Sequence, residues 1–268
     1  MRARQMLAAG LGFFILGVAG APAQQTADPR IADIVHARKL RVALGLGSPA
    51  LAIKDPSGEV HGPAMDLAVA LATRMGVDLK PVQYPRPGAV LDGLANHEWD
   101  VTFLVADPAR AAIVDFSPPY MLSDFTYLVP ASSTKKAAAE MDQQGVRIAV
   151  PRNDASDLRL TKIIQHAELV RVDSIAAALD LVRGGQAEAY AGPRVVLLGL
   201  AGQVPGARVL DDGFADIAFA AMVPKGKAGH LAYVSEFIEA AKAGGLVKQA
   251  IDQAHLHGVK VAPPRKAE

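Results

Sequence analysis

An alternation of strand-forming and helix-forming segments, repeated twice along the chain, constrains the fold more than any other feature of the sequence. Strands are expected where short runs are rich in apolar and β-branched residues, and helices where apolar residues recur at helical spacing. The first run predicts strands over 40–44, 77–84 and 100–105, and helices over 65–75 and 89–96. Such an alternation is typical of a parallel sheet covered by helices.

The same alternation starts again in the second half of the chain. It predicts strands over 147–150, 168–172 and 187–191, and helices over 157–166 and 175–183. Two similar α/β units therefore follow one another along the sequence.

Two extended segments connect these units. Residues 125–130 lead from the first unit to the second, and residues 216–224 lead back, before a last strong helix over 230–243. Two such strands side by side would form a hinge, with closure near Val129-Pro130 and Ala218-Phe219.

The predicted fold is thus α/β and two-lobed, with a two-strand hinge. The expected divisions are a signal peptide over 1–23, lobe one over 24–129, lobe two over 130–217, a return to lobe one over 218–261 and a disordered tail over 262–268.

The N-terminus has the features of an export signal. Arg2 and Arg4 precede the apolar run 6–20, and Ala21-Pro22-Ala23 supplies the pattern of small residues that a signal peptidase cuts after. We expect a mature chain that begins at Gln24 and lies in the periplasm. The chain has no Cys, so it offers neither a disulfide framework nor a lipid-attachment site. A membrane anchor is not expected.

The charge balance argues against a nucleic-acid partner. Removal of residues 1–23 takes away two Arg, which leaves 26 of the 28 basic residues beside 27 acidic ones. A chain so near neutrality lacks a basic surface that could follow a phosphate backbone. The seven His are scattered, and the pair His255 and His257 is weak support for a metal, so neither a metal nor a cofactor is expected. Without an oligomerisation pattern, we expect a monomer.

Several motifs resemble those of a known family. The stretch Asp107-Pro-Ala-Arg-Ala-Ala-Ile-Val-Asp-Phe-Ser-Pro-Pro-Tyr120 is similar to a signature of the periplasmic amino-acid-binding proteins of ABC transporters, the family 3 solute-binding proteins. Residues 62–72, 172–179 and 185–191 resemble further parts of the family pattern. The resemblance implies a type II periplasmic-binding-protein fold with two Rossmann-like lobes, a ligand in the cleft between them, and an inner-membrane ABC permease as partner.

The resemblance also implies that Arg110 anchors the carboxylate of the ligand. A guanidinium can bind a carboxylate through two parallel charge-assisted hydrogen bonds. Local sequence agrees, because Asp107 is a good N-cap and Pro108 suits the first helical position, which places Arg110 in a first turn beside free N–H groups. The alternative is that Arg110 pairs with Asp107.

Departures from the family pattern alter the expected ligand. Asp107 replaces a Thr that contacts the ligand carboxylate, and the acid that receives the ligand ammonium falls on Pro193. The aromatic residues expected around the ligand map to Ser48 and Pro87. Because an ammonium would then lack a partner in a closed cleft, we expect carboxylates without an α-amino group to bind better than amino acids.

Other side chains could compensate for these losses. Arg194 could be a second cationic anchor or a solvated loop residue, and Phe103 and Tyr84 could form apolar walls, although Phe103 also suits the core. Asn153, Asp154 and Ser156 could bond the ligand, with a helix cap as the alternative for Asp154 and Ser156. The candidate ligand-binding residues are Arg110, Asp107, Ser48, Phe103, Tyr84, Asn153, Ser156 and Arg194.

The expected function is therefore capture of a small organic acid or amino-acid-like ligand and its delivery to a permease, without catalysis. Two alternatives stay open. Periplasmic cyclohexadienyl dehydratases have the same two-lobed architecture, but their chemistry needs a positioned general acid, for which Glu188 and Glu59 lack convincing partners. The chain could also be an accessory protein that docks a periplasmic redox enzyme or sensor.

Overall fold

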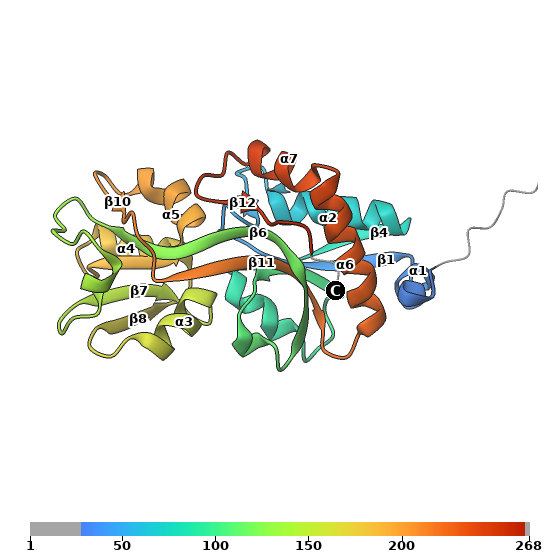
Figure 1. The fold of residues 1–268 in the computed structure, drawn as a ribbon, viewed down its shortest axis with the longest axis horizontal. Coiled ribbons are helices and arrows are strands. Elements are labelled where there is room, and N and C mark those ends of the chain that lie inside the picture. Colours follow the sequence, from blue (N-terminus) through green and yellow to red (C-terminus); the bar gives the residue numbers. More distant parts are fainter. Residues whose placement is uncertain (1–27, 266–268) are drawn as a thin grey trace, which may run out of the picture.

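The computed structural model describes residues 28–265, which form two lobes (Figure 1). The segments predicted as a signal peptide and as the end of the tail, residues 1–23 and 266–268, lie outside this range. One mixed sheet passes through both lobes in the strand order β4-β1-β5-β11-β6-β9-β7-β8. The two-lobed α/β fold expected from the sequence is confirmed.

Lobe one is built around three parallel strands. Its central strand β1 pairs with β4 on one side and β5 on the other. Helix α2 packs on β1 and β4, α6 packs on the crossing strands, and α7 packs on α2 and α6. The elements are β1 (Lys39–Gly45), β4 (Asp78–Tyr84), β5 (Val101–Val105), α2 (Pro63–Met75), α6 (Ala228–Ala243) and α7 (Leu246–Gln253).

Lobe two repeats this arrangement on a smaller scale. Strand β7 pairs in parallel with β8 and β9, and helices α3, α4 and α5 cover the strands. These elements are β7 (Arg147–Pro151), β8 (Glu168–Val172), β9 (Ala189–Pro193), α3 (Ala155–Ile163), α4 (Ile175–Arg183) and α5 (Arg194–Leu200). Shorter elements, with η for a 3-10 helix, are η1 (Pro29–Ile31), α1 (Ala32–His36), β2 (Ile53–Lys54), β3 (Val60–His61), η2 (Pro87–Gly93), η3 (Pro108–Arg110), η4 (Ala138–Met141), η5 (Ala201–Gln203), β10 (Arg208–Val209) and β12 (Lys260–Val261).

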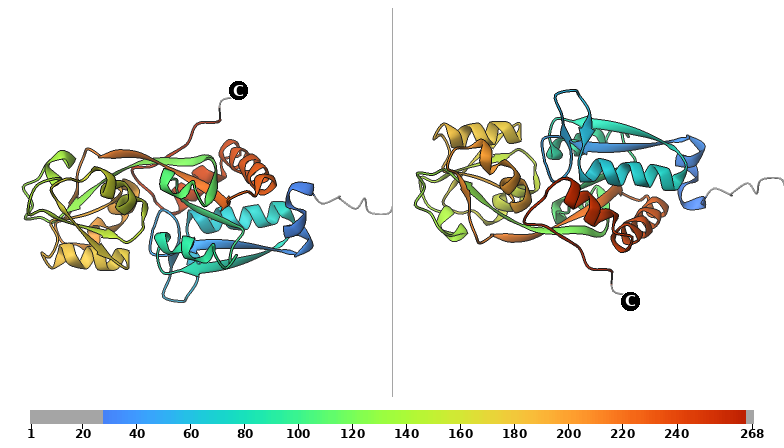
Figure 2. Two further views of the ribbon diagram at one scale, coloured as in Figure 1. Left: turned by 90° about the horizontal axis from the view of Figure 1, so that it is seen from below. Right: turned by 90° about the horizontal axis from the view of Figure 1, so that it is seen from above.

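Two antiparallel strands, β6 (Val114–Val129) and β11 (Ala215–Pro224), connect the lobes. They run side by side in Figure 1, and both views in Figure 2 place the crossing along one side of the molecule. From Phe125 to Leu128, β6 already pairs with β9 of lobe two, so the chain enters lobe two earlier than the expected boundary after residue 129. One long strand therefore belongs to both lobes, which a search for separate strands does not detect.

The local patterns of sequence explain most elements. In α2, the buried residues Leu67, Leu71 and Met75 recur at helical spacing, and Gly76 ends the helix in the left-handed conformation at φ 68°. All five residues of β5 are buried, as expected for a central strand covered on both faces. Trp99, before β5, is 1% exposed and donates from its indole nitrogen to the carbonyl of Val90 at 2.9 Å.

Two expectations about local structure are wrong. The helix expected over 89–96 is the 3-10 helix η2, because Pro87, Gly88 and Gly93 lower the α-helical propensity of so short a segment. The tail expected to be disordered from 262 still belongs to the fold at its start, where Ala262 is 2% exposed and donates to the carbonyl of Tyr120.

Within residues 28–265, no helix has the length and apolar character needed to cross a membrane.

Candidate functional site

A small cavity lies between the lobes, at the ends of the strands that lead into the cleft. Lobe one lines it with Ser48, Leu51, Pro87, Leu104, Val105 and Arg110, and lobe two with Asp154, Ala155, Ser156, Ile175, Tyr190, Pro193 and Val196. Phe125 and Phe219, on the two crossing strands, complete the lining. The cavity has a volume of about 30 Å³, room for no more than a few water molecules.

Arg110 is the cation of this cavity. It ends η3, a single turn that Asp107 caps by accepting from the backbone nitrogen of Ala109 at 2.7 Å. Its side chain is buried, with the residue 3% exposed. Nη1 donates to the carbonyl of Val105 at 2.9 Å, and Nη2 donates to the carbonyl of Asn153, across the cleft, at 3.2 Å. Because η3 is one turn long, the guanidinium itself must attract an anion, and the helix N-terminus adds little.

The Arg110 guanidinium can donate further hydrogen bonds. Its Nε is buried without a hydrogen-bond partner, and it forms no ion pair with any carboxylate of residues 28–265. The alternative that Arg110 pairs with Asp107 is therefore wrong. Burial lowers the pKa of Arg110, while the charges of Asp154 and Asp107 act in the opposite direction.

Asp154 is the acid of the same cavity. It occupies the N-cap position of α3, yet its side chain makes no capping bond. Instead, Oδ1 accepts from the backbone nitrogen of Gly88 in lobe one at 2.6 Å. The residue is 9% exposed. Burial raises the pKa of Asp154 to about 6, against the opposing effect of the Arg110 charge.

This acid corrects the expectation drawn from Pro193. Pro193 does line the cavity, but Asp154 reaches the cavity from a different segment of lobe two. A ligand ammonium would therefore have a carboxylate available to it. The sequence left Asp154 as either a ligand-bonding residue or a helix cap, and it could not show the bond to Gly88, which lies 66 positions away along the chain.

Three of the eight candidate residues, Arg110, Ser48 and Ser156, line the cavity. Asp107 is also buried, but its side chain caps η3. Asn153 contributes its backbone carbonyl to Arg110.

The aromatic candidates lie elsewhere. Phe103 is 1% exposed and packs edge-on against Tyr120, with the ring centroids 6.1 Å apart, so it belongs to the core. The Tyr84 hydroxyl donates to Glu98, outside the cavity lining. The apolar walls are instead Leu104, Phe125, Tyr190 and Phe219, which lie on strands that the sequence had assigned to the core or the hinge.

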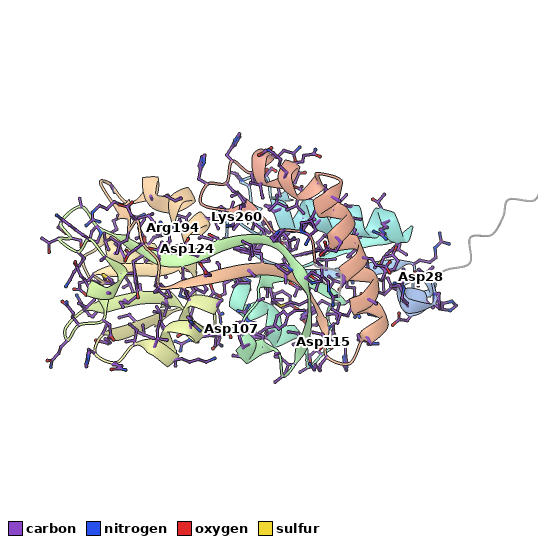
Figure 3. All side chains as sticks on the ribbon, in the orientation of Figure 1. Asp28, Asp107, Asp115, Asp124, Arg194 and Lys260 are labelled. Carbon is purple, nitrogen blue, oxygen red and sulfur yellow. The ribbon has the colours of Figure 1, made fainter. Side chains whose placement is uncertain are left out.

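Arg194 is also outside the cavity lining. Its guanidinium donates to both carboxylate oxygens of Asp124, at 2.7 and 2.6 Å, and to the carbonyls of Leu210 and Asp211. Figure 3 shows Arg194 beside Asp124, where lobe two meets β6, with Asp107 on the other side of the crossing strands in this view. Arg194 therefore joins α5 to a crossing strand.

We expect Arg194→Ala to leave ligand affinity unchanged and to lower the free energy of unfolding by about 1–2 kcal/mol, because it removes charge-assisted bonds at a partly exposed site. Urea unfolding and calorimetry measure the two effects. A loss of affinity without a loss of stability would indicate that Arg194 takes part in ligand binding.

A larger groove adjoins the cavity. It has a volume of about 590 Å³, is bounded by both lobes and shares Ile175 with the cavity. The groove and the cavity are also bordered by neighbouring residues of the same segments, such as Pro49 beside Ser48 and Val195 beside Val196. The groove is therefore the outer part of the same interlobe cleft.

Two α/β lobes, a two-strand connection and a cavity between the lobes, with an Arg and an Asp among largely apolar walls, define a two-lobed ligand-binding protein. Residues 40–256 match the model of the bacterial extracellular solute-binding proteins, family 3. The chain belongs to this family, which confirms the resemblance seen in its motifs.

Individual relatives are distant. The chain is 25% identical to the glutamine-binding protein of Geobacillus stearothermophilus over 167 residues, which are 60% of this chain and 63% of the relative. The match thus spans less than two thirds of that protein.

Solved structures share the fold. A solute receptor for L-cysteine of Neisseria gonorrhoeae has a TM-score of 0.77 at 23% identity, over 84% of this chain and 92% of the other. An amino acid ABC transporter substrate-binding protein of Streptococcus pneumoniae, bound to L-arginine, has a TM-score of 0.76 at 22% identity, over 84% and 97%. An ancestral amino acid-binding protein, a precursor of cyclohexadienyl dehydratase, has a TM-score of 0.75 at 24% identity, over 83% and 98%.

Proposed function

We propose that this protein captures a small carboxylate-bearing ligand in the interlobe cavity and delivers it to an inner-membrane ABC permease. The observation that carries the proposal is the buried Arg110 guanidinium, which lines the cavity and, among the residues that the structure describes, has no carboxylate partner and no acceptor for its Nε. A ligand carboxylate would supply the missing acceptor in a site where water competes little. The N-terminal export signal supports a periplasmic location.

The ligand is proposed to carry a cationic or hydrogen-bond-donating group as well. Asp154 faces the cavity from lobe two, and a ligand ammonium beside it would compensate the cost of burying its charge. The preference for acids without an amino group rested on the lack of such an acid, and we do not retain it. Glutamine and L-arginine, in the names of the relatives, are molecules of the proposed kind.

The lobes must separate for this ligand to enter. Pockets that enclose a small ligand have volumes on the order of 300–1,000 Å³, whereas the cavity measures about 30 Å³. Strands β6 and β11 connect the lobes and would carry the hinge.

Native mass spectrometry of protein purified gently from the periplasm tests the proposal. We expect a bound mass that corresponds to a small amino acid or organic acid, is lost on mild activation, and is absent from the Arg110→Ala variant. The proposal would be contradicted if the protein carried no bound mass and also gave no heat of binding when titrated with the common amino acids and dicarboxylates.

Asp154 has a separate expected effect on ligand choice. In a matched pair such as glutamate and glutarate, Asp154→Asn should lower the affinity for the amino acid by about tenfold or more. The affinity for the des-amino analogue should fall less, because only the amino acid loses a charged partner. Calorimetry on the ligand that the mass identifies, and on its des-amino analogue, measures the difference. Equal losses for both would remove Asp154 from ammonium recognition.

A dehydratase is a second candidate, and one observation favours it. A buried carboxyl with its pKa raised to about 6 is suited to act as a general acid, here beside a guanidinium that could hold a substrate carboxylate. In dehydration of a cyclohexadienol, Asp154 would donate its proton to the hydroxyl group, which leaves as water, and the Asp154 carboxylate would then take up the ring proton whose loss makes the ring aromatic. Ultraviolet absorbance of an aromatic product, formed by the native protein and not by Asp154→Asn, would support this activity.

A further inference from the structure

Three donors from lobe one converge on one turn of lobe two. The turn, Arg152–Asp154, connects β7 to α3. Arg86 Nη1 donates to the carbonyl of Arg152, and Arg110 Nη2 donates to the carbonyl of Asn153 at 3.2 Å. The backbone nitrogen of Gly88 donates to Oδ1 of Asp154 at 2.6 Å. Each residue of the turn thus bonds to the opposite lobe.

Lobe two holds the turn in place by itself. The nitrogen of Arg152 donates to the carbonyl of Val172 at 2.8 Å, and the nitrogen of Asn153 donates to Asp157 at 2.9 Å. Asn153 has φ 60°, a left-handed conformation that Asn tolerates better than most residues. Because these bonds form within lobe two, the turn loses little further conformational entropy when lobe one meets it.

The turn uses the donors that a ligand carboxylate would need. One of them is Nη2 of Arg110, which lines the cavity of about 30 Å³, and another is the N–H of Gly88, next to the lining residue Pro87. With the turn in this position, the space that remains is far smaller than the roughly 300–1,000 Å³ of pockets that enclose a small ligand.

We propose that the turn Arg152–Asp154 is an internal occupant of the cleft, which holds the two lobes closed without a ligand and must be displaced before a ligand binds. The inference rests on the proposed function for the place of the ligand, whereas its test concerns contacts between the lobes and needs no ligand. It has a consequence for any ligand of the cleft, because only the open fraction of molecules can bind. A closed fraction of about 99% would lower the apparent affinity about 100-fold.

Gly88 offers a substitution that acts on the closed state. A Cβ at this position would lie 2.6 Å from Oδ1 of Asp154 and 2.8 Å from the carbonyl oxygen of Arg152, both in lobe two, and 2.6 Å from Nη1 of Arg86 in lobe one. The Arg86 side chain is flexible and can move aside, whereas the backbone carbonyl of lobe two cannot, so alanine obstructs closure. Gly88 has no left-handed φ, and alanine is therefore compatible with the local backbone of lobe one.

The test is a distance measurement between the lobes. The chain has no Cys, so Lys80→Cys in lobe one and Lys162→Cys in lobe two, both at exposed positions, give a unique pair of spin-label sites. The full chain is first unfolded in denaturant and refolded, with its mass checked, so that no copurified ligand holds it closed. Electron spin resonance then reports the distribution of distances between the labels.

We expect one short distance for the native protein and a shift to longer distances for Gly88→Ala. Gly202→Ala is the matched control, because no neighbouring atom of residues 28–265 lies within 4 Å of its added Cβ, and it should keep the short distance. Arg86→Met removes the donor to Arg152 without adding bulk to the interface, and it should shift the distance distribution in the same direction as Gly88→Ala. It replaces Gly88→Ala in the test if Gly88→Ala does not refold. Long distances in the native protein, or a short distance that neither variant changes, would overturn the proposal.

Discussion

Arg110→Ala is expected to lower the affinity of the proposed ligand by about 2–5 kcal/mol, which corresponds to roughly 30-fold to several thousand-fold. The guanidinium is the cation that lines the cavity, and it is removed from water by both lobes. Alanine therefore leaves the ligand carboxylate buried without a partner, and calorimetry on the ligand identified by mass measures the loss.

The same substitution also affects stability. Alanine would leave the carbonyls of Val105 and Asn153 without their donor. We expect the free energy of unfolding to fall by about 1–3 kcal/mol, with the fold retained by circular dichroism.

Arg110→Lys separates the two effects, because it keeps a positive charge but cannot form the two parallel bonds of a guanidinium. Lysine should recover part of the stability and little of the affinity. Ligand binding by Arg110→Ala at native affinity would show that Arg110 is not the anchor.

Asp154→Asn is expected to stabilise the protein at neutral pH and to have little effect in acid. The folded protein holds the pKa of Asp154 at about 6, above the value of 3.8 for an exposed Asp, because burial disfavours the carboxylate. The folded state therefore binds this proton more tightly than the unfolded state. The associated stability is present below pH 4 and is lost as the pH rises through 6.

The raised pKa converts into a cost on the order of 3 kcal/mol for the ionised carboxyl at pH 7. Asn avoids this cost while retaining an oxygen that can accept from Gly88. In urea unfolding between pH 3.5 and 7.5, the stability of Asp154→Asn relative to the native protein should therefore rise with pH and level off above 6.

Asp115→Asn is the control for this pH dependence. Lys225 and the backbone of Gly226 bond to Asp115 and lower its pKa. Its stabilising effect is present above the pKa of an unfolded Asp and is lost in acid, so the substitution should cost stability at neutral pH and not at low pH. If the stability difference between Asp154→Asn and the native protein stayed constant or fell with pH, the conclusion that burial disfavours the ionised form of Asp154 would be contradicted.

Much of the fold was predictable because it depends on near neighbours in the sequence. Apolar spacing indicated α2 and its end at Gly76, and a run of buried residues indicated β5. The signature around Arg110 indicated the family, which the match over residues 40–256 confirms. Errors arose where one element serves two lobes, as β6 does, or where glycine and proline leave a short helix as a 3-10 turn, as in η2.

The sequence by itself determined the two α/β units, their order and the family signature that contains Arg110, since helical and strand periodicity are set by residues close together along the chain. Only the tertiary structure decided which charged groups meet. Asp154 has the sequence context of a helix cap but bonds to Gly88 of the other lobe, and Arg194 pairs with Asp124 across 70 positions. Such partners are chosen by the packing of distant segments and by the cost of burying a charge, neither of which leaves a pattern in the local sequence.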